Sequence, residues 1–341
     1  MPITIKQIAE MANVSRGTVD KVLNKRPGIK KETREKILKI AKELNYQPNF
    51  LGKALVQSKA PLKIAVILTP GHNPFIQEML KGIKNAEEEY RAFGIKILIK
   101  IPISLEPSEQ ISILNDLSES GVSGIAVFPI DDTQVRSKIN QLIDDGIHII
   151  TFNSQLDGLK DFCFVGQNHR KGGATAAGLM SKLLPNGGCV GIIISSYNLS
   201  CHKDRLKGFL DKINATKSRI TILEVTENQD CKTDAFKQTL DFYNKSPNLK
   251  GIYITGGGVA GIGNALDIAS PTHPPHIICH DLVPETLALL KSGVVDFALG
   301  QSPEIQGYQI IKILFDSLVK KQKPLSRHFE IPITISTQDS I

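Results

Sequence analysis

The sequence predicts a small all-α unit at the N-terminus, followed by an α/β body of two doubly wound parallel-sheet lobes. Two observations predict this division. Residues 1–59 hold 13 Lys and Arg against 5 Asp and Glu, whereas the rest of the chain holds 28 against 29. From Leu62 onward, short apolar strands alternate with amphipathic helices, which is typical of parallel sheets with helices on both faces. The 341 residues suffice for several domains, each with its own core.

Three short helices are expected in the basic N-terminal unit. Thr4 followed by Gln7 fits the start of the first helix, with a side-chain cap and a reciprocal Gln. Ser15 is a good cap for the second helix, expected over residues 16–23. The third helix is expected over residues 31–44. Two helices joined by a tight turn form the helix-turn-helix pattern, and a basic unit of this kind suggests a polyanionic partner.

The second helix is expected to present a polar outer face. Its apolar side chains share one side, so the opposite side carries, near the N-terminus, Arg16, Gly17, Asp20 and Lys21. That is where a recognition helix meets base edges in the major groove. Arg16 and Lys21 can donate to guanine, and Gly17 lets the backbone approach DNA closely. For Asp20 we expect an ion pair with Arg16, with acceptance from a cytosine amino group as the alternative.

The segment "TIKQIAEMANVSRGTVDKVLNKRPGIKKETREKILKIAKELNYQPN" resembles the DNA-binding head of the lactose-repressor (LacI) family of bacterial transcription regulators. The resemblance covers residues 3–57. It implies that Arg16, Gly17 and Lys21 read bases in double-stranded operator DNA. It also implies a wider set of DNA-contacting residues: Thr4, Ser15, Thr18, Asn24, Lys53 and Leu55. The family usually has Ser where this chain has Asp20, which puts a phosphate contact there in doubt.

The segment "PNFLGKALVQSKAP" resembles the hinge helix that orders on DNA in this family. By this resemblance, Leu55 is the apolar wedge that enters the minor groove. The family usually has Ala-Arg where this chain has Gly52-Lys53. Gly costs about 1 kcal/mol in a helix, so we expect the hinge to be disordered off DNA, and an ordinary linker is the alternative. The expected domains are residues 1–48, the helix-turn-helix head; 49–60, the hinge helix and linker; and 61–341, the two-lobed effector-binding and dimerisation domain.

The body is expected to contain ten strands, at residues 63–68, 95–101, 124–130, 147–152, 162–166, 189–194, 220–225, 251–255, 277–280 and 297–300. That number is too large for one compact sheet, so two lobes are expected. A ligand site is expected in the cleft between them, at the carboxyl ends of the strands. Residues 62 to about 338 resemble the type I periplasmic sugar-binding fold, which is also the effector domain of the LacI family.

The resemblance to that fold implies a set of effector-binding residues in the cleft. The segments "NPF", "DRLKGF", "HD" and "LGQSPEIQGY", together with a strand end, supply them: Asn73, Phe75, Asn153, Arg205, Asp281 and Gln301. An aromatic face can stack on a pyranose, while the polar groups hydrogen-bond to hydroxyls. Relatives often have Asp-Arg in place of Asn153-Ser154 and Asn-Asp in place of Gly256-Gly257. The resemblance leads us to expect a sugar as the effector. Because of these departures, a sugar phosphate, an inositol or a non-sugar metabolite stays open as an alternative.

Two other patterns offer alternative interpretations. The glycines Gly256, Gly258 and Gly261 follow a predicted strand, and Asp281 lies twenty residues further on, as in a dinucleotide-binding fingerprint. A tight turn between strand and helix explains the same glycines. Several His and Cys lie around the strand before Asp281, but alternation places neighbours on opposite faces, so we expect no metal site. We also expect no cofactor.

The predicted function is a cytoplasmic, ligand-responsive DNA-binding transcription regulator, expected to be a repressor and a homodimer. No secretory signal opens the chain, and no apolar run approaches the ~18–20 residues of a membrane span. The five scattered cysteines indicate reduced thiols. One rival function is a solute-binding protein, which would need an export signal and no DNA-binding head. Another is nucleotide-cofactor binding at Gly256–Gly261, either by an enzyme or by a regulator, whereas we see no catalytic motif and expect no enzyme.

Overall fold

The computed structural model describes residues 5–23, 26–44, 61–70, 73–322 and 326–341. The chain divides into two compact units, one made of residues 1–61 with 92–94 and the other of residues 62–91 with 95–341. Four of the residues expected to contact DNA lie outside the described residues: Thr4, Asn24, Lys53 and Leu55. The predicted hinge, residues 49–60, lies outside them as well.

The N-terminal unit contains α1 (Ile5–Ala12), α2 (Arg16–Leu23) and α3 (Lys31–Glu43). Apolar side chains from all three helices form one small core, with Ile8, Val19 and Ile37 fully buried. The Ser15 hydroxyl accepts a hydrogen bond from the backbone N–H of Thr18 at 3.1 Å. This contact confirms Ser15 as the cap of α2, and it fixes the direction in which α2 leaves the turn.

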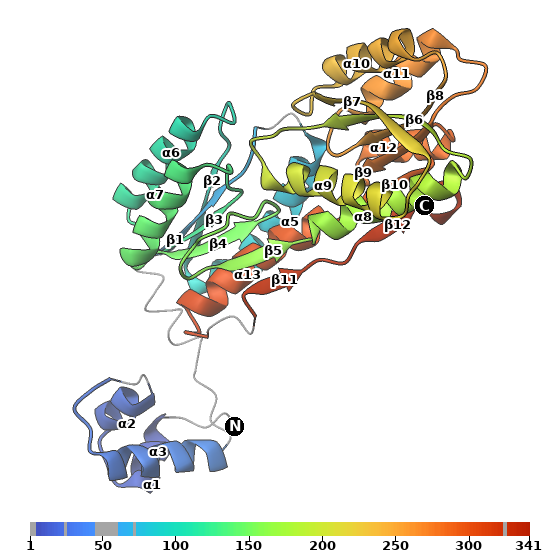
Figure 1. Ribbon diagram of the computed structural model, residues 1–341. Coiled ribbons are helices and arrows are strands. Elements are labelled where there is room, and N and C mark those ends of the chain that lie inside the picture. Colours follow the sequence, from blue (N-terminus) through green and yellow to red (C-terminus); the bar gives the residue numbers. More distant parts are fainter. Residues whose placement is uncertain (1–4, 24–25, 45–60, 71–72, 323–325) are drawn as a thin grey trace. The chain divides into compact units, whose positions relative to one another are not determined.

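The second unit consists of two lobes, each built on a six-stranded sheet (Figure 1). In lobe 1 all strands are parallel, in the order β11 (His328–Glu330), β5 (Cys163–Gly166), β4 (His148–Phe152), β3 (Gly124–Val127), β1 (Leu62–Ile67) and β2 (Ile95–Lys100). In lobe 2 the order is β12 (Thr334–Ser336), β10 (Phe297–Gly300), β9 (His276–His280), β8 (Leu249–Ile254), β6 (Gly188–Ile194) and β7 (Ile220–Glu227). Only β12 pairs antiparallel among the described strands of this sheet.

All ten predicted strands are present, and the two lobes are confirmed. The sequence analysis missed β11 and β12, which are only three residues long. All three residues of β11 are exposed, so this strand lacks the apolar run that marks the buried strands.

Helices cover both faces of each sheet (Figure 1). Lobe 1 carries α5 (Pro74–Tyr90) and α13 (Pro303–Leu318) on one face, and α6 (Pro107–Glu119) and α7 (Thr133–Asp144) on the other. Lobe 2 carries α8 (His169–Leu183) and α9 (Ser200–Ala215) on one face, and α10 (Lys232–Lys245), α11 (Val259–Ala269) and α12 (Pro284–Lys291) on the other. Within the described residues, none of the helices combines the length and apolarity needed to cross a membrane.

The chain passes between the two lobes three times, near residues 167, 301 and 332. The side chain of Gln167 lies in the first passage, and its Nε2 donates to the backbone oxygen of Gly300 at 2.7 Å and of Pro332 at 2.9 Å. One buried amide therefore joins all three passages. Because the strands of both lobes end near these passages, the loops at their carboxyl ends face each other across a cleft.

Candidate functional site

The outer face of α2 is exposed and polar in the structure. Arg16, Gly17 and Lys21 are exposed, whereas Val19 and Val22 on the opposite side are buried. A Cβ added at Gly17 would meet only the Ser15 hydroxyl, at 3.8 Å. Packing within the head therefore does not require a glycine at this position.

The structure gives Asp20 a different partner from the expected Arg16. The Asp20 carboxylate lies 3.7 Å from the guanidinium of Arg26, which follows the turn after α2. Arg34 of α3 in turn donates to the backbone oxygen of Arg26 at 2.9 Å. These contacts connect α2 to the segment that leads into α3. Both charged groups of the ion pair are well exposed, so the pair adds little stability.

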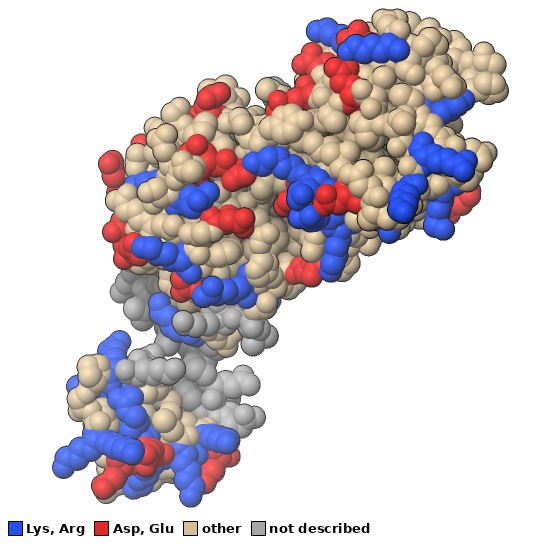
Figure 2. Space-filling view, in the orientation of Figure 1, with Lys and Arg blue, Asp and Glu red and all other residues tan. Residues whose placement is uncertain are grey.

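Basic side chains dominate the charge of the N-terminal unit. Its described residues carry ten Lys and Arg against five Asp and Glu. Figure 2 shows many blue basic side chains and fewer red acidic ones on the visible face of this unit, and blue and red side chains interspersed on the visible face of the body. Such a charge excess favours phosphate contacts that weaken as salt rises.

The six predicted effector residues come together around one cavity between the lobes. Asn73, Phe75, Asn153, Arg205, Asp281 and Gln301 all line it, with Thr69, Phe128, Leu199, Cys201, His202 and Asp230. The cavity measures about 20 Å³. That is room for about one water molecule, whereas pockets for small ligands usually exceed ~300 Å³. The two lobes are therefore closed on each other in this structure, and a sugar-sized ligand requires them to part.

Polar contacts hold the two lobes together beside this cavity. Asn73 Nδ2 of lobe 1 donates to Asp230 Oδ2 of lobe 2 at 3.1 Å. The hydroxyls of Ser154 and Ser200 lie 2.8 Å apart. Asp131 of lobe 1 forms an ion pair with Lys203 of lobe 2. Contacts of this kind form only when the lobes close, so they favour the closed arrangement.

Arg205 is the main hydrogen-bond donor facing the cavity. Its side chain is only 1% exposed, and its Nη1 donates to the backbone oxygen of Thr255 at 2.6 Å. Its Nε and Nη2 are buried and have no hydrogen-bond partner among the described residues. A buried guanidinium with unsatisfied donors is destabilising on its own. Both nitrogens therefore retain hydrogen-bond donors that no described residue uses.

Asp281 and Gln301 form a second polar group on the cavity wall. Gln301 Nε2 donates to Asp281 Oδ1 at 2.8 Å. The Oε1 of Gln301 and the Oδ1 of Asn153 are buried without a partner among the described residues, so both can accept from a ligand. Burial raises the pKa of Asp281 to about 6, although the nearby Arg205 charge opposes this rise. Asp281 therefore remains mostly ionised at neutral pH.

Several of these polar residues have an uncommon backbone conformation. Asn153, Asp230 and Asp281 follow β4, β7 and β9, with φ of 56°, 58° and 69°. Positive φ is uncommon for residues other than glycine, although Asn and Asp tolerate it best. Strained residues tend to cluster at functional sites, where the surrounding structure holds them in place. The cleft is such a cluster.

Asp230 and His202 are cavity residues that the sequence analysis missed. Asp230 Oδ1 accepts from the backbone N–H of Gly257 at 2.6 Å. His202 Nδ1 lies 3.2 Å from the Thr255 hydroxyl oxygen. A signal for Asp230 exists in the sequence, because the polar segment "ENQD" begins one residue after the strand predicted over residues 220–225. No local sequence pattern marks His202 as a cavity residue. It lies on α9, and only the packing of that helix in the folded lobe brings its side chain to the cavity.

Three buried histidines surround Arg205 without adding charge. Burial lowers the pKa of His169 and His280 well below the usual value, and the nearby Arg205 charge lowers it further. Burial also lowers the pKa of His202 to about 4. All three side chains are therefore neutral at physiological pH. His280 Nε2 lies 2.9 Å from the Tyr253 hydroxyl oxygen. Among the described residues, no group of three or more His, Cys, Asp or Glu could hold a metal ion.

Packing accounts for the glycines of the possible dinucleotide fingerprint. Gly258 has φ of 97° at the start of α11, where few other residues fit. A Cβ at Gly261 would lie 2.0 Å from the backbone oxygen of Lys232 in α10. The N–H of Gly257 is already bonded to the Asp230 carboxylate, so this turn holds a protein anion rather than an open phosphate cradle. These contacts favour the tight-turn interpretation.

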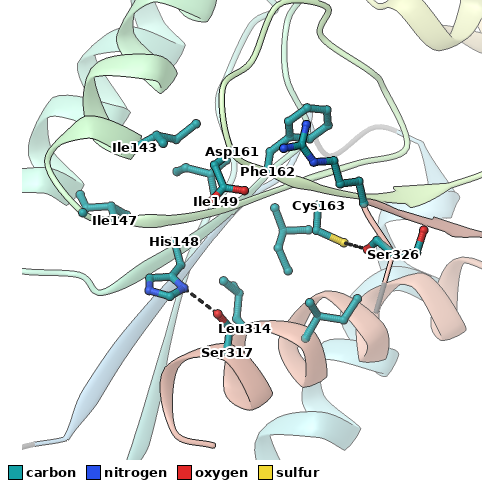
Figure 3. A pocket seen from close by; sticks show the side chains of 14 residues that line it. Ile143, Ile147, His148, Ile149, Asp161, Phe162, Cys163, Leu314, Ser317 and Ser326 are labelled. Carbon is teal, nitrogen blue, oxygen red and sulfur yellow. Dashed lines mark hydrogen bonds between the residues drawn. The ribbon is translucent and has the colours of Figure 1, made fainter. Parts of the chain in front are cut away.

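A larger hollow, of about 410 Å³, lies in lobe 1 at the opposite end of the strands from the cleft (Figure 3). It is lined mainly by apolar side chains where β4 and β5 begin, and it contains none of the predicted site residues. His148 Nδ1 lies 2.7 Å from the Ser317 hydroxyl oxygen, and the thiol of Cys163 faces the backbone of Ser326 (Figure 3). Burial raises the pKa of Cys163 to about 11, so its thiol is protonated and unreactive.

Comparison with known protein families divides the chain into the same N-terminal unit and two-lobed body as the structure does. The profile of bacterial regulatory proteins of the lacI family matches residues 4–49, and the profile of the periplasmic binding protein domain matches residues 64–322. The D-allose-binding periplasmic protein of Escherichia coli (strain K12) is 23% identical over 268 residues, which are 76% of this chain and 85% of that protein.

Two further similar proteins are a transcriptional repressor and a sugar-binding protein of known crystal structure. The probable HTH-type transcriptional repressor ExuR of Bacillus subtilis (strain 168) is 34% identical over 150 residues, 42% of this chain and 44% of that protein. The crystal structure of GanP, a glucose-galactose binding protein from Geobacillus stearothermophilus, aligns with a TM-score of 0.75 at 20% identity. The alignment covers 82% of this chain and 99% of that chain, and it shows the shared fold.

A helix-turn-helix head and a two-lobed binding domain on one chain define a ligand-responsive, DNA-binding transcription regulator. The chain belongs to the periplasmic binding protein domain family, whose profile matches most of it, and its residues 4–49 form a DNA-binding domain of the lacI family of bacterial regulatory proteins.

Proposed function

We propose that this regulator is a cytoplasmic homodimeric repressor that binds a sugar-class effector in the interlobe cleft and double-stranded operator DNA with its heads. The observation that carries the effector part is the buried Arg205, which lines a cavity between two closed lobes and whose Nε and Nη2 have no hydrogen-bond partner in the described part of the chain. Such a site needs a ligand with several oxygens. The regulator role itself requires no catalysis, and the absence of an enzymatic activity stays a prediction.

On the DNA side, we propose that the exposed face of α2 reads bases. Arg16 and Lys21 donate to base edges, and Gly17 permits close approach of the backbone. Ser15 and Thr18 lie at the start of α2, where hydroxyl and backbone groups suit phosphate contacts. The resemblance to the LacI family adds Thr4, Asn24, Lys53 and the Leu55 wedge. Two heads of a dimer would bind a roughly palindromic operator, since dimer symmetry is mirrored in the half-sites.

On the effector side, we propose that the twelve residues lining the cleft include those that bind the ligand. Arg205 supplies donors, whereas Asp281, Asn153 and Gln301 supply acceptors. Phe75 and Phe128 supply apolar ring surface. Several similar proteins are named for the sugars that they bind, which supports a carbohydrate as the effector.

The closed cleft suggests how the ligand would act on DNA binding. Because the cavity has room for only about one water molecule, the ligand must enter with the lobes apart. Lobe closure around it then changes the position of lobe 1, which is directly connected to the segment that leads to the head. The ligand alters operator affinity only if it binds the two lobe arrangements with unequal affinity.

An exposed apolar edge supports the homodimer. β2 is an edge strand of lobe 1, and Ile99 near its end and Ile101 and Ile103 just after it are exposed, Ile103 to 89%. Proteins normally cover such an edge, and a second copy of this chain related by twofold symmetry would do so.

Replacing Leu55 with Ala tests the DNA-binding part of the proposal. We expect specific DNA binding to weaken by roughly tenfold or more, with non-specific binding little changed, because a minor-groove wedge acts only on correctly seated DNA. The measurement is fluorescence anisotropy with an operator selected from random DNA, against a scrambled duplex. Equal loss on both DNAs would rule out the wedge role, and an inability to select any sequence would overturn the operator-binding proposal.

A further inference from the structure

The charges that line the cleft are unbalanced toward the negative. Among the described lining residues, Arg205 carries a positive charge, while Asp230 and Asp281 carry negative charges. His202 faces the same cavity, but burial lowers its pKa, so it adds no positive charge. The three charged groups are close enough to influence one another, because both Arg205 and Asp230 affect the ionisation of Asp281. At neutral pH the described wall of the cavity therefore carries one excess negative charge.

The position of Asp230 depends on two neighbouring glycines. A Cβ at Gly256 would lie 2.7 Å from Asp230 Oδ1, and a Cβ at Gly257 would lie 3.0 Å from it. Any larger residue at either position would displace the carboxylate. Gly256 and Gly257 thus provide the space that the carboxylate occupies, and the N–H of Gly257 binds it at 2.6 Å.

Asn73 holds the same carboxylate from the other lobe. Its Nδ2 donates to Asp230 Oδ2, while its own Oδ1 accepts from the backbone N–H of Phe75 at 2.9 Å. Because the Oδ1 is engaged in capping α5, the amide presents its NH₂ group to the carboxylate. Each oxygen of Asp230 therefore has one fixed donor, and each keeps a further lone pair for a hydroxyl donor. Asp230 and the preceding Gln229 both have positive φ, which costs backbone energy that a purely structural surface residue would not require.

We propose that Asp230 is a specificity-determining residue that restricts the effector to polyhydroxyl compounds without an acidic group. This inference rests on the proposed role of the cleft as the effector site. A hydroxyl can donate to Asp230 or Asp281 and accept from the Nε or Nη2 of Arg205. A ligand carboxylate or phosphate could pair with Arg205, but it would lie in the same small cavity as two carboxylates. The repulsion is strong in a buried site that excludes water.

Calorimetric titration of the full-length protein with matched ligands tests the proposal. The uncharged probes are D-glucose, D-galactose and D-ribose, and their anionic counterparts are D-glucuronate, D-galacturonate and ribose 5-phosphate. We expect at least one uncharged sugar to bind, and its anionic counterpart to bind at least about tenfold more weakly. An anionic probe that binds as tightly as its uncharged counterpart would overturn the proposal. Binding of none of these probes at millimolar concentration would also overturn it, whereas DNA binding in the anisotropy assay would leave the regulator role intact.

Replacing Asp230 with Asn tests the role of this residue directly. The substitution keeps the shape and an acceptor for Gly257, but it removes the charge and the acceptor for Asn73. We expect the preference for the uncharged sugar over its anionic counterpart to fall by about tenfold, mainly through tighter binding of the anion. Asp234→Asn is the matched control, because Asp234 lies on α10 with an exposed side chain that pairs with Lys237. A preference in Asp230→Asn equal to that of the control would contradict the proposal, and thermal unfolding of both variants checks that they fold.

Discussion

The two walls of the cleft have different chemistry although the two lobes share one architecture. Lobe 1 contributes five of the described lining residues, two of them aromatic and none charged: Thr69, Asn73, Phe75, Phe128 and Asn153. Lobe 2 contributes all three charged residues of the described lining: Arg205, Asp230 and Asp281. Gln301 lies in a passage between the lobes. Since both sheets have the same strand order around their centres, the difference comes from the loops and helix ends that follow the strands.

This contrast indicates an order of events in ligand binding. Arg205 and Asp230 each have a hydrogen bond within lobe 2, to Thr255 and Gly257 respectively, and Asn73 of lobe 1 adds a second one to Asp230. A ligand could therefore be oriented first by lobe 2. Lobe 1 would then close over it with apolar ring surface and with Asn73. If the contrast holds, removing a charged group of lobe 2 should reduce affinity far more than removing an aromatic ring of lobe 1.

The largest expected effect is that of Arg205→Ala on effector binding. We expect ligand affinity to fall by roughly a hundredfold or more, because the variant loses several charge-assisted hydrogen bonds at once. Operator binding without ligand should remain, since Arg205 lies in lobe 2 and outside the head. Calorimetry with the sugar identified above measures the first effect. Lys207→Ala is the control, because Lys207 lies on the same helix, α9, with an exposed side chain. Unchanged ligand affinity in Arg205→Ala would contradict the assignment of the cleft.

Phe75→Leu should have a smaller effect. The ring lines the cavity at the start of α5, and replacing it with Leu keeps an apolar side chain but removes the flat face. Loss of ring stacking amounts to about 1 kcal/mol, or roughly a fivefold weaker affinity. The control is Phe162→Leu, which makes the same change in lobe 1 at the hollow that lies at the opposite end of the strands from the cleft. A loss as large as that of Arg205→Ala would break the proposed contrast between the walls.

The smallest expected effect concerns Asp281 and pH. Its folded-state pKa of about 6 lies above the ordinary value of 3.8, so the folded protein binds this proton more tightly than the unfolded chain. The free energy of unfolding should therefore rise as the pH falls through 6, because the buried carboxylate of Asp281 then takes up a proton. Well above pH 6 the carboxylate is fully charged, and its destabilising effect is at its largest. Between pH 8 and pH 5, the ligand-free wild type should gain about 1 kcal/mol relative to Asp281→Asn. Asn can still accept from Gln301, and the other titrating groups are common to both proteins. Chemical denaturation at the two pH values measures the difference, and parallel pH dependence in both proteins would refute the raised pKa.

Most of the head was predictable because its pattern is local. Apolar side chains at helical spacing define the inner face of α2, and the exposed Arg16, Gly17 and Lys21 follow from that spacing alone. The partner of Asp20 was not predictable in this way. Arg16 is one helical turn away in sequence, but the turn after α2 brings Arg26 to the carboxylate instead. The spacing of apolar residues along α2 and α3 does not predict the conformation of the turn between them.

The cleft was predictable only in part, because its residues come from many separate strands. Asn153 and Asp281 follow predicted strands directly, so the topology alone places each at the carboxyl edge of its own sheet. Asp230 lies three residues after the end of β7, and its position depends on the space left by Gly256 and Gly257, which only the three-dimensional packing reveals. The same packing explains why these glycines, together with Gly258 and Gly261, imitate a dinucleotide fingerprint. The closed state of the lobes likewise depends on contacts between segments far apart in sequence, such as that between Ser154 and Ser200.

The most direct test of the account is the effect of a cleft ligand on operator affinity in the full-length protein. Fluorescence anisotropy would measure binding to the selected operator with and without the sugar found by calorimetry, in the wild type and in Arg205→Ala. The account predicts that the sugar changes operator affinity in the wild type, in either direction, and has no effect in Arg205→Ala, while both proteins bind the operator equally well without sugar. A sugar response that persists in Arg205→Ala would show that the effector acts elsewhere than in the interlobe cleft.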